Sequence, residues 1–144
     1  MGTRALADIL SSRREEHGFL LTAWVFLPNH WHAILFPRAP LTVSRVMESV
    51  KVSSTLRINR ERDEKETLWQ SRFFDQALRT VKEYGETIEY IHWNPVKAGL
   101  VSRPKDWRWS SALDYTTNVD QPCEAARILL IDRIVLPADE KTRI

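Results

Sequence analysis

Residues 19–36 read FLLTAWVFLPNHWHAILF. Two apolar, β-favouring runs, Phe19 to Leu27 and His30 to Phe36, flank a Pro-Asn pair that favours a tight turn. The pattern predicts a β-hairpin. In its second strand His30 and His32 stand two positions apart, so we expect both imidazoles to project from the same face of the sheet.

Two imidazoles on one face of a strand can share a divalent cation. A pair of ordinary strand histidines is the alternative interpretation of the same pattern. No cysteine and no carboxylate close in the sequence completes a closed zinc site around His30 and His32. If a metal binds here, the sequence therefore favours an open site that leaves room for water or phosphate.

Further elements are predicted on both sides of the hairpin from the spacing of apolar residues. A helix is expected before the hairpin, and it should end at Gly18, because glycine readily adopts the left-handed backbone conformation that terminates helices. Another long helix is expected to start at Thr80, because Thr80 and Glu83 have the spacing of a capping box, and to end before Pro95. The predicted elements outside the hairpin are a helix over Thr3 to His17, a helix over Thr42 to about Arg62, a strand over Leu68 to Leu78 and a helix over Thr80 to Asn94.

The helix predicted over residues 80–94 has two faces with different chemistry. At roughly 100° per residue, Tyr90 and Asn94 lie together, roughly 90 to 120° away from the apolar stripe. That stripe consists of Val81, Tyr84, Ile88 and Ile91. Tyr90 is therefore not an obvious core residue. A metal held by His30, His32 and the side-chain oxygen of Asn94 would lie beside the Tyr90 hydroxyl.

Other conspicuous aromatic residues receive a structural interpretation. His92 lies two positions from Tyr90 and faces another direction on the helix, so we expect a packed or hydrogen-bonding histidine rather than a metal ligand. Trp107 and Trp109 are expected to pack the C-terminal segment onto the rest of the chain.

Length and composition narrow the class of protein. The chain has 144 residues, 43% of them hydrophobic and 28% charged, which predicts one globular domain and excludes collagen-like, disordered and membrane proteins. The longest apolar runs are too short to span a bilayer. We expect no secretory signal over Met1 to Arg14, because this stretch has no basic region followed by a long apolar run. The single cysteine, Cys123, fits the reducing cytoplasm. The net charge of +2 does not by itself indicate a nucleic-acid-binding protein.

Four motifs in their order and spacing carry a resemblance to a known family. They are AWVFLPNHWHAIL at 23–35, LWQSRFFD at 68–75, YIHWNPVKAGLV at 90–101 and WSS at 109–111. With these motifs the chain resembles the REP-associated tyrosine transposases, which are domesticated relatives of the single-tyrosine HUH transposases. The resemblance extends from about Ala23 to Tyr115.

The resemblance implies an α+β fold, with a ferredoxin-like antiparallel sheet and helices on one face. It also implies a metal-dependent enzyme that cuts and rejoins single-stranded DNA next to hairpins through a 5′-phosphotyrosine. Tyr90 would be the nucleophile, and His30, His32 and Asn94 would bind Mg²⁺ or Mn²⁺. Single-stranded or hairpin DNA would be the partner of a monomer or homodimer. The candidate phosphate contacts are Arg57, Arg60, Arg72, Arg79, Lys97, Arg103, Lys105 and Arg108. The alternative interpretation of each of them is an ordinary surface charge.

One departure from the family pattern leaves alternatives open. The family fold begins with a strand beside the His-x-His strand, whereas only about 18 residues precede the hairpin here and they read as helix. We therefore expect a shortened HUH domain over 1–115, without the usual first strand, and a tail over 116–144 that packs on it. Residues Arg127 to Leu136 are the best candidate to fill the gap. The alternative functions are a hairpin-binding remnant without catalysis and a small metal-binding or protein-interaction domain.

Overall fold

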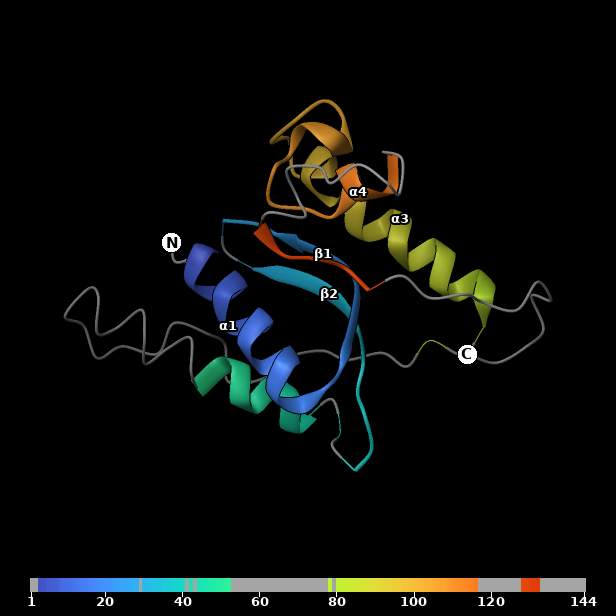
Figure 1. Ribbon diagram of the computed structural model, residues 1–144. Helices are drawn as coiled ribbons and strands as arrows, with labels where there is room; N and C mark the ends of the chain where they lie inside the picture. Colours follow the sequence, from blue (N-terminus) through green and yellow to red (C-terminus); the bar gives the residue numbers. More distant parts are fainter. Residues whose placement is uncertain are drawn as a thin grey trace. The chain divides into compact units, whose positions relative to one another are not determined.

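The computed structural model describes residues 3–28, 30–40, 42, 44–52, 78, 80–116 and 128–132 (Figure 1). The chain divides into two compact units, one made of Met1–Leu20 and Leu35–Asp75 and the other of Leu21–Ile34 and Gln76–Ile144. The predicted boundary at residue 115 stays a prediction.

The first unit contains α1, which spans Thr3–His17 as predicted. Its apolar side chains at positions 6, 9 and 10 are buried. The helix ends at Gly18, whose φ of 71° is in the left-handed region and whose N–H donates to the carbonyl of Arg14 at 2.7 Å.

A second helical segment of this unit covers residues 44–52, with Val46, Met47 and Val50 buried at helical spacing. It confirms the first part of the helix predicted over 42–62. The rest of that helix lies outside the described residues. So does the strand predicted over 68–78, apart from Leu78, which is not in a strand.

The second unit contains most of the hairpin of β1, Leu20–Phe26, and β2, Trp31–Phe36, which form a two-stranded sheet (Figure 1). The Leu27 N–H donates to the carbonyl of His30 at 2.7 Å and closes the turn. The predicted hairpin is thereby confirmed. Every residue of β1 from Leu21 onward is buried, which is typical of a strand covered on both faces.

The backbone of β1 also pairs with the segment 109–111. The Phe26 N–H donates to the carbonyl of Trp109 at 2.8 Å, and the Ser111 N–H donates to the carbonyl of Trp24 at 3.0 Å. Between these bonds lies an antiparallel bridge from Val25 to Ser110. The indole N–H of Trp107 donates to the Phe26 carbonyl at 2.9 Å, so this tryptophan packs the C-terminal segment onto the hairpin, as predicted.

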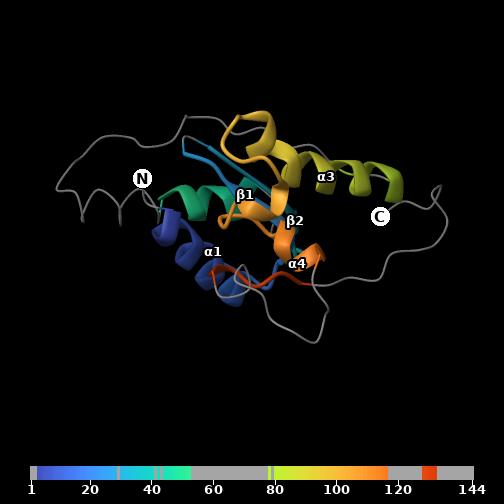
Figure 2. The ribbon, with the colours of Figure 1, turned by 90° about the horizontal axis from the view of Figure 1, so that it is seen from above.

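A short piece of the C-terminal tail, residues 128–132, contacts β1 (red in Figures 1 and 2). The Asp132 N–H donates to the carbonyl of Leu21 at 2.7 Å, and the Asp132 carboxylate accepts from the Leu21 N–H at 2.9 Å. The carbonyl of Leu129 accepts from the Trp24 indole at 3.1 Å. Of the segment expected to fill the gap, the described residues therefore contact the hairpin, but they do not form a strand.

The long helix α3 spans Val81–Lys97 and begins as predicted. The hydroxyl of Thr80 accepts from the N–H of Glu83 at 3.1 Å and caps the first turn. The predicted end at Asn94 is wrong, because the helix continues through Pro95 for almost another turn. A proline removes its own N–H and crowds the turn before it, but the turn after it can still close.

Backbone bonds close the end of α3 beyond the proline. Ala98 N–H donates to the Asn94 carbonyl at 2.9 Å, and Leu100 N–H donates to the Pro95 carbonyl at 2.9 Å. Gly99, with a φ of 76°, permits this left-handed ending.

Two short helices, η1 (Pro104–Asp106) and α4 (Ala112–Thr116), complete the described part of the second unit. η1 packs against both α3 and α4. The combination of a small antiparallel sheet with helices confirms the predicted α+β class. None of the helices in the described ranges is both long and apolar enough to span a bilayer.

Candidate active site

The predicted site residues of the hairpin and of α3 meet in the structure. The rings of His30 and His32 lie 5.1 Å apart between centroids. The ring of His32 lies 5.6 Å from the ring of Tyr90, edge to face. The Asn94 amide nitrogen lies 3.4 Å from Nε2 of His32, although the two residues are 62 positions apart in the sequence. The fold thus brings together all four residues that the sequence singled out for chemistry.

The residues of this cluster differ in burial, and burial affects the pKa of His32. Tyr90 is 49% exposed, so a substrate can reach its hydroxyl. His32 is half-buried, and its pKa lies below the ordinary value of 6.5, first because burial disfavours the charged ring and second because His30 repels the charge. His32 is therefore neutral at pH 7, the form in which an imidazole donates a lone pair to a metal.

The donor atoms of the cluster fit an open divalent site. Two imidazoles supply nitrogen, and the side-chain amide of Asn94 carries both an N–H donor and an oxygen acceptor. Within the described ranges, no group of three or more His, Cys, Asp or Glu side chains could hold a metal ion. Among the described residues, the amide oxygen of Asn94 would be the third protein ligand of a metal at this cluster.

His92 lies on the opposite side of α3 and is buried. Its Nε2 lies 2.8 Å from Oγ of Ser111, and its ring packs on Tyr115 with centroids 4.7 Å apart. Burial lowers the pKa of His92 to about 4. The prediction of a packed, hydrogen-bonding histidine is confirmed.

Ser111 links this histidine to the hairpin. Its hydroxyl oxygen accepts from the Trp24 N–H at 3.0 Å. The chain Trp24–Ser111–His92 therefore fixes α3 to β1 and sets which side of the helix presents Tyr90. Sequence reasoning assigned Ser111 no role, and its only signal was the Trp-Ser-Ser motif.

Four of the eight predicted phosphate contacts are described, and all four are exposed. Arg103 pairs with Asp106 at 3.1 Å, and the guanidinium of Arg108 lies 5.2 Å from the ring centroid of Trp109. The ammonium nitrogen of Lys97 lies 5.4 Å from the ring centroid of Tyr90. The residues outside the described part are Arg57, Arg60, Arg72 and Arg79.

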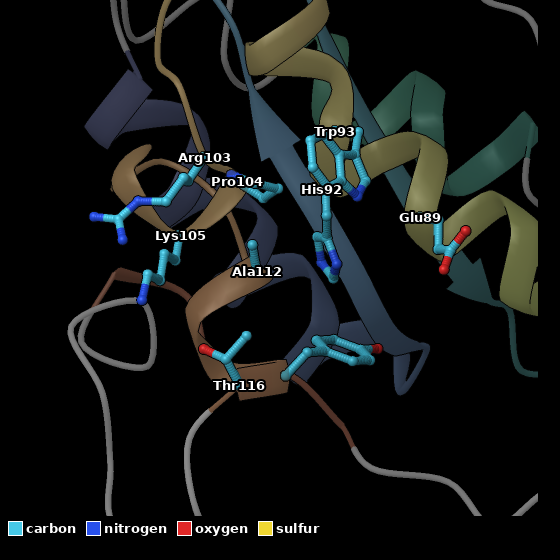
Figure 3. Close-up of a pocket in the computed structure, with 9 residues that line it drawn as sticks. Glu89, His92, Trp93, Arg103, Pro104, Lys105, Ala112 and Thr116 are labelled. Carbon is cyan, nitrogen blue, oxygen red and sulfur yellow. The ribbon is translucent and has the colours of Figure 1, made fainter.

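A pocket of about 370 Å³ lies beside α3 (Figure 3). Glu89, His92 and Trp93 line it from α3. The remaining lining residues come from η1, its N-terminal cap and α4, and they include Arg103 and Lys105. Tyr90 and Asn94 do not line it, so the pocket is separate from the candidate active site.

Comparison with known proteins defines the class. Residues 3–94 match the family described as "Transposase IS200 like", which is more than half of the chain. The chain therefore belongs to the IS200-like transposase family.

Within that class the similarity is to REP-associated tyrosine transposases. A protein of this name from Escherichia coli K12 is 32% identical over 99 residues, which cover 68% of this chain and 57% of the relative. A putative one from Haemophilus influenzae is 29% identical over 107 residues, which cover 67% and 61%. The aligned part is thus less than two thirds of the length of either relative.

A solved structure gives a similar result. It is a REP-associated tyrosine transposase bound to a REP hairpin, and it superposes with a TM-score of 0.71 at 26% identity. The match covers 92% of this chain and 80% of that one. The resemblance drawn from the four sequence motifs is confirmed.

Proposed function

We propose that this chain cuts and rejoins single-stranded DNA beside hairpins through a covalent bond between Tyr90 and a 5′ phosphate. The observation that carries the proposal is that His32 of β2 contacts both Tyr90 and Asn94 of α3, a helix distant from β2 in the sequence. Hairpin DNA is the proposed substrate because a similar protein has been solved bound to a REP hairpin.

In this proposal His30, His32 and Asn94 hold Mg²⁺ or Mn²⁺. The bound ion would supply Lewis-acid stabilisation of the negative charge on the attacked phosphate. The chain contributes the neutral form of His32, which burial favours, and the neutral amide oxygen of Asn94. Because these ligands are neutral and only three, the ion would keep its charge and open positions for a phosphate.

The chemical step follows from the position of Tyr90. Its hydroxyl oxygen forms a bond to phosphorus while the bond from phosphorus to the 3′ oxygen breaks. The phenol proton leaves to water, which the 49% exposure of the side chain permits, and the departing 3′ oxygen takes up a proton from water. The products are a 5′-phosphotyrosine and a free 3′ hydroxyl. Attack by a 3′ hydroxyl on the phosphotyrosine reverses these bonds and rejoins the strand.

The phosphate backbone of the DNA would be bound by exposed cations of the second unit. Lys105 and Arg108 are exposed and follow α3 in the chain. Such contacts position the strand without reading its sequence.

The proposal is tested by denaturing electrophoresis of the wild-type chain after incubation with a labelled, single-stranded hairpin and Mn²⁺. We expect a covalent protein–DNA adduct. Tyr90→Phe removes only the attacking oxygen and should abolish the adduct. Tyr84→Phe is the matched control, because Tyr84 is buried on the other side of the same helix and should not affect the adduct.

Two outcomes would contradict the proposal. Wild-type chain that binds the hairpin and forms no adduct would favour the non-catalytic hairpin-binding alternative. An adduct formed by Tyr90→Phe would show that another residue is the nucleophile.

A further inference from the structure

We infer that Lys97 is a catalytic residue of the proposed cleavage reaction, whose ammonium group binds a non-bridging oxygen of the phosphate that Tyr90 attacks. This inference rests on the proposed function. It assigns Lys97 a role at the reacting phosphate, in contrast to Lys105 and Arg108, whose proposed role is to hold the DNA backbone.

The geometry of α3 aims Lys97 at Tyr90. The two residues are seven positions apart, which is about two turns, so they lie on the same side of the helix. Long side chains on a helix point back toward its N-terminus, and this direction carries the ammonium of Lys97 toward Tyr90. The ammonium nitrogen lies 5.4 Å from the centroid of the Tyr90 ring.

The surroundings of Tyr90 place other groups of the candidate site beside the same ring. His32 packs edge to face against it at 5.6 Å, and Asn94 stands one turn from Tyr90 toward Lys97. A phosphate that meets the Tyr90 hydroxyl therefore approaches a surface that already carries a cation. Negative charge builds on the oxygens of a phosphate during transfer, and a fixed cation at that place stabilises the transition state.

The sequence of α3 leaves the charge of Lys97 available. An acidic residue three or four positions earlier would pair with a helical lysine, but these positions hold Asn94 and Trp93. A cation in the last turn of a helix also interacts favourably with the terminal carbonyls. That structural role predicts an effect on stability, whereas a role at the attacked phosphate predicts an effect on the rate.

The experiment measures the rate of adduct formation at saturating hairpin DNA, the hairpin Kd and the thermal midpoint, for the wild type and three variants. Lys97→Met removes the charge and keeps most of the side chain. Lys97→Arg keeps the charge. Lys82→Met is the matched control. Lys82 is exposed on the same helix and lies about two turns from Tyr90, toward the N-terminus of α3.

We expect Lys97→Met to slow adduct formation at saturation about 10- to 100-fold, with Kd and thermal midpoint close to those of Lys82→Met. Lys97→Arg should recover most of the rate. If Lys97→Met reacts at the wild-type rate once DNA is saturating, the inference is wrong and Lys97 is an ordinary phosphate contact or a helix-end charge. A loss in Lys97→Met that Lys97→Arg does not recover, or that follows a lowered thermal midpoint, also overturns it. Wild-type chain that forms no adduct overturns the proposed function itself.

Discussion

Nε2 of His92 lies 2.8 Å from Oγ of Ser111, and both side chains are buried. His92 stands between Tyr90 and Asn94 in the sequence but faces the other way. The hydrogen bond therefore fixes the rotation of α3 about its own axis. The contact thus helps to hold α3 in the orientation that leaves Tyr90 exposed.

Ser111→Ala should destabilise the chain by about 1 to 3 kcal/mol, because it leaves the buried N–H of Trp24 and the ring of His92 without their hydroxyl partner. Urea unfolding followed by tryptophan fluorescence measures this change. Ser102→Ala, at an exposed position, is the control and should change little. Equal stability of the two variants would contradict the anchoring role of Ser111.

The stability of the chain should fall as the pH drops below the ordinary pKa of histidine. Burial lowers the pKa of His92 to about 4 in the folded state, against 6.5 for an exposed ring. The unfolded chain therefore binds the proton more readily between these values, and protonation favours unfolding. Above pH 6.5 the ring of His92 is neutral in both states and does not lower stability. As the pH falls from 6.5 to 4, the free energy of unfolding decreases progressively, by about 3 kcal/mol at most.

The pH effect is isolated by comparing the wild type with His92→Gln, whose amide can still bond to Ser111. The free energy of unfolding of the variant should depend less on pH between 6.5 and 4. His17→Gln, at the end of α1, serves as the control. Identical pH profiles for the wild type and His92→Gln would rule out His92 as the titrating group.

Removal of a proposed metal ligand should separate cleavage from binding. His32→Ala should reduce adduct formation to the level seen with a chelator, and hairpin affinity should stay largely unchanged, because Lys105 and Arg108, the proposed contacts to the DNA backbone, are not part of this cluster. Asn94→Asp keeps a ligating oxygen and should retain activity that Asn94→Ala loses. Cleavage by His32→Ala in chelator at the wild-type rate would exclude a metal at this site.

Hairpin affinity should decrease steeply as the salt concentration rises, since each phosphate contact releases counterions. Lys105→Gln and Arg108→Gln should each lower the slope of log affinity against log salt by roughly 1. Lys82→Gln, on an exposed turn of α3, should leave the slope as it is. A titration without salt dependence would instead support a protein-interaction domain.

The elements nearest the site could be predicted from sequence because their signals are local. Alternating apolar residues around a Pro-Asn pair define the hairpin, and Thr80 with Glu83 defines the start of α3. The proximity of His32, Tyr90 and Asn94 followed from the helical angle between Tyr90 and the apolar stripe, together with the family resemblance.

Other features depend on contacts that no local pattern contains. The continuation of α3 past Pro95 is set by Gly99 and by backbone bonds after the proline, whereas the sequence rule considers only the proline. The role of Ser111 depends on a partner 19 positions away, His92, and on the backbone of a strand 87 positions away. Small hydroxyl residues give no signal of such long-range bonds.

The pairing of β1 with residues 109–111 also affects how copies of the chain meet one another. Leu20–Phe26 reads LLTAWVF, an uncharged stretch of high β-propensity, and the bare edge of such a strand is a template for other strands. The bonds from Trp109 and Ser111 occupy part of that edge. Substitutions that weaken the pairing of residues 109–111 with β1 should therefore cause self-association through β1. Such variants should form insoluble aggregates before unfolded monomer accumulates in solution.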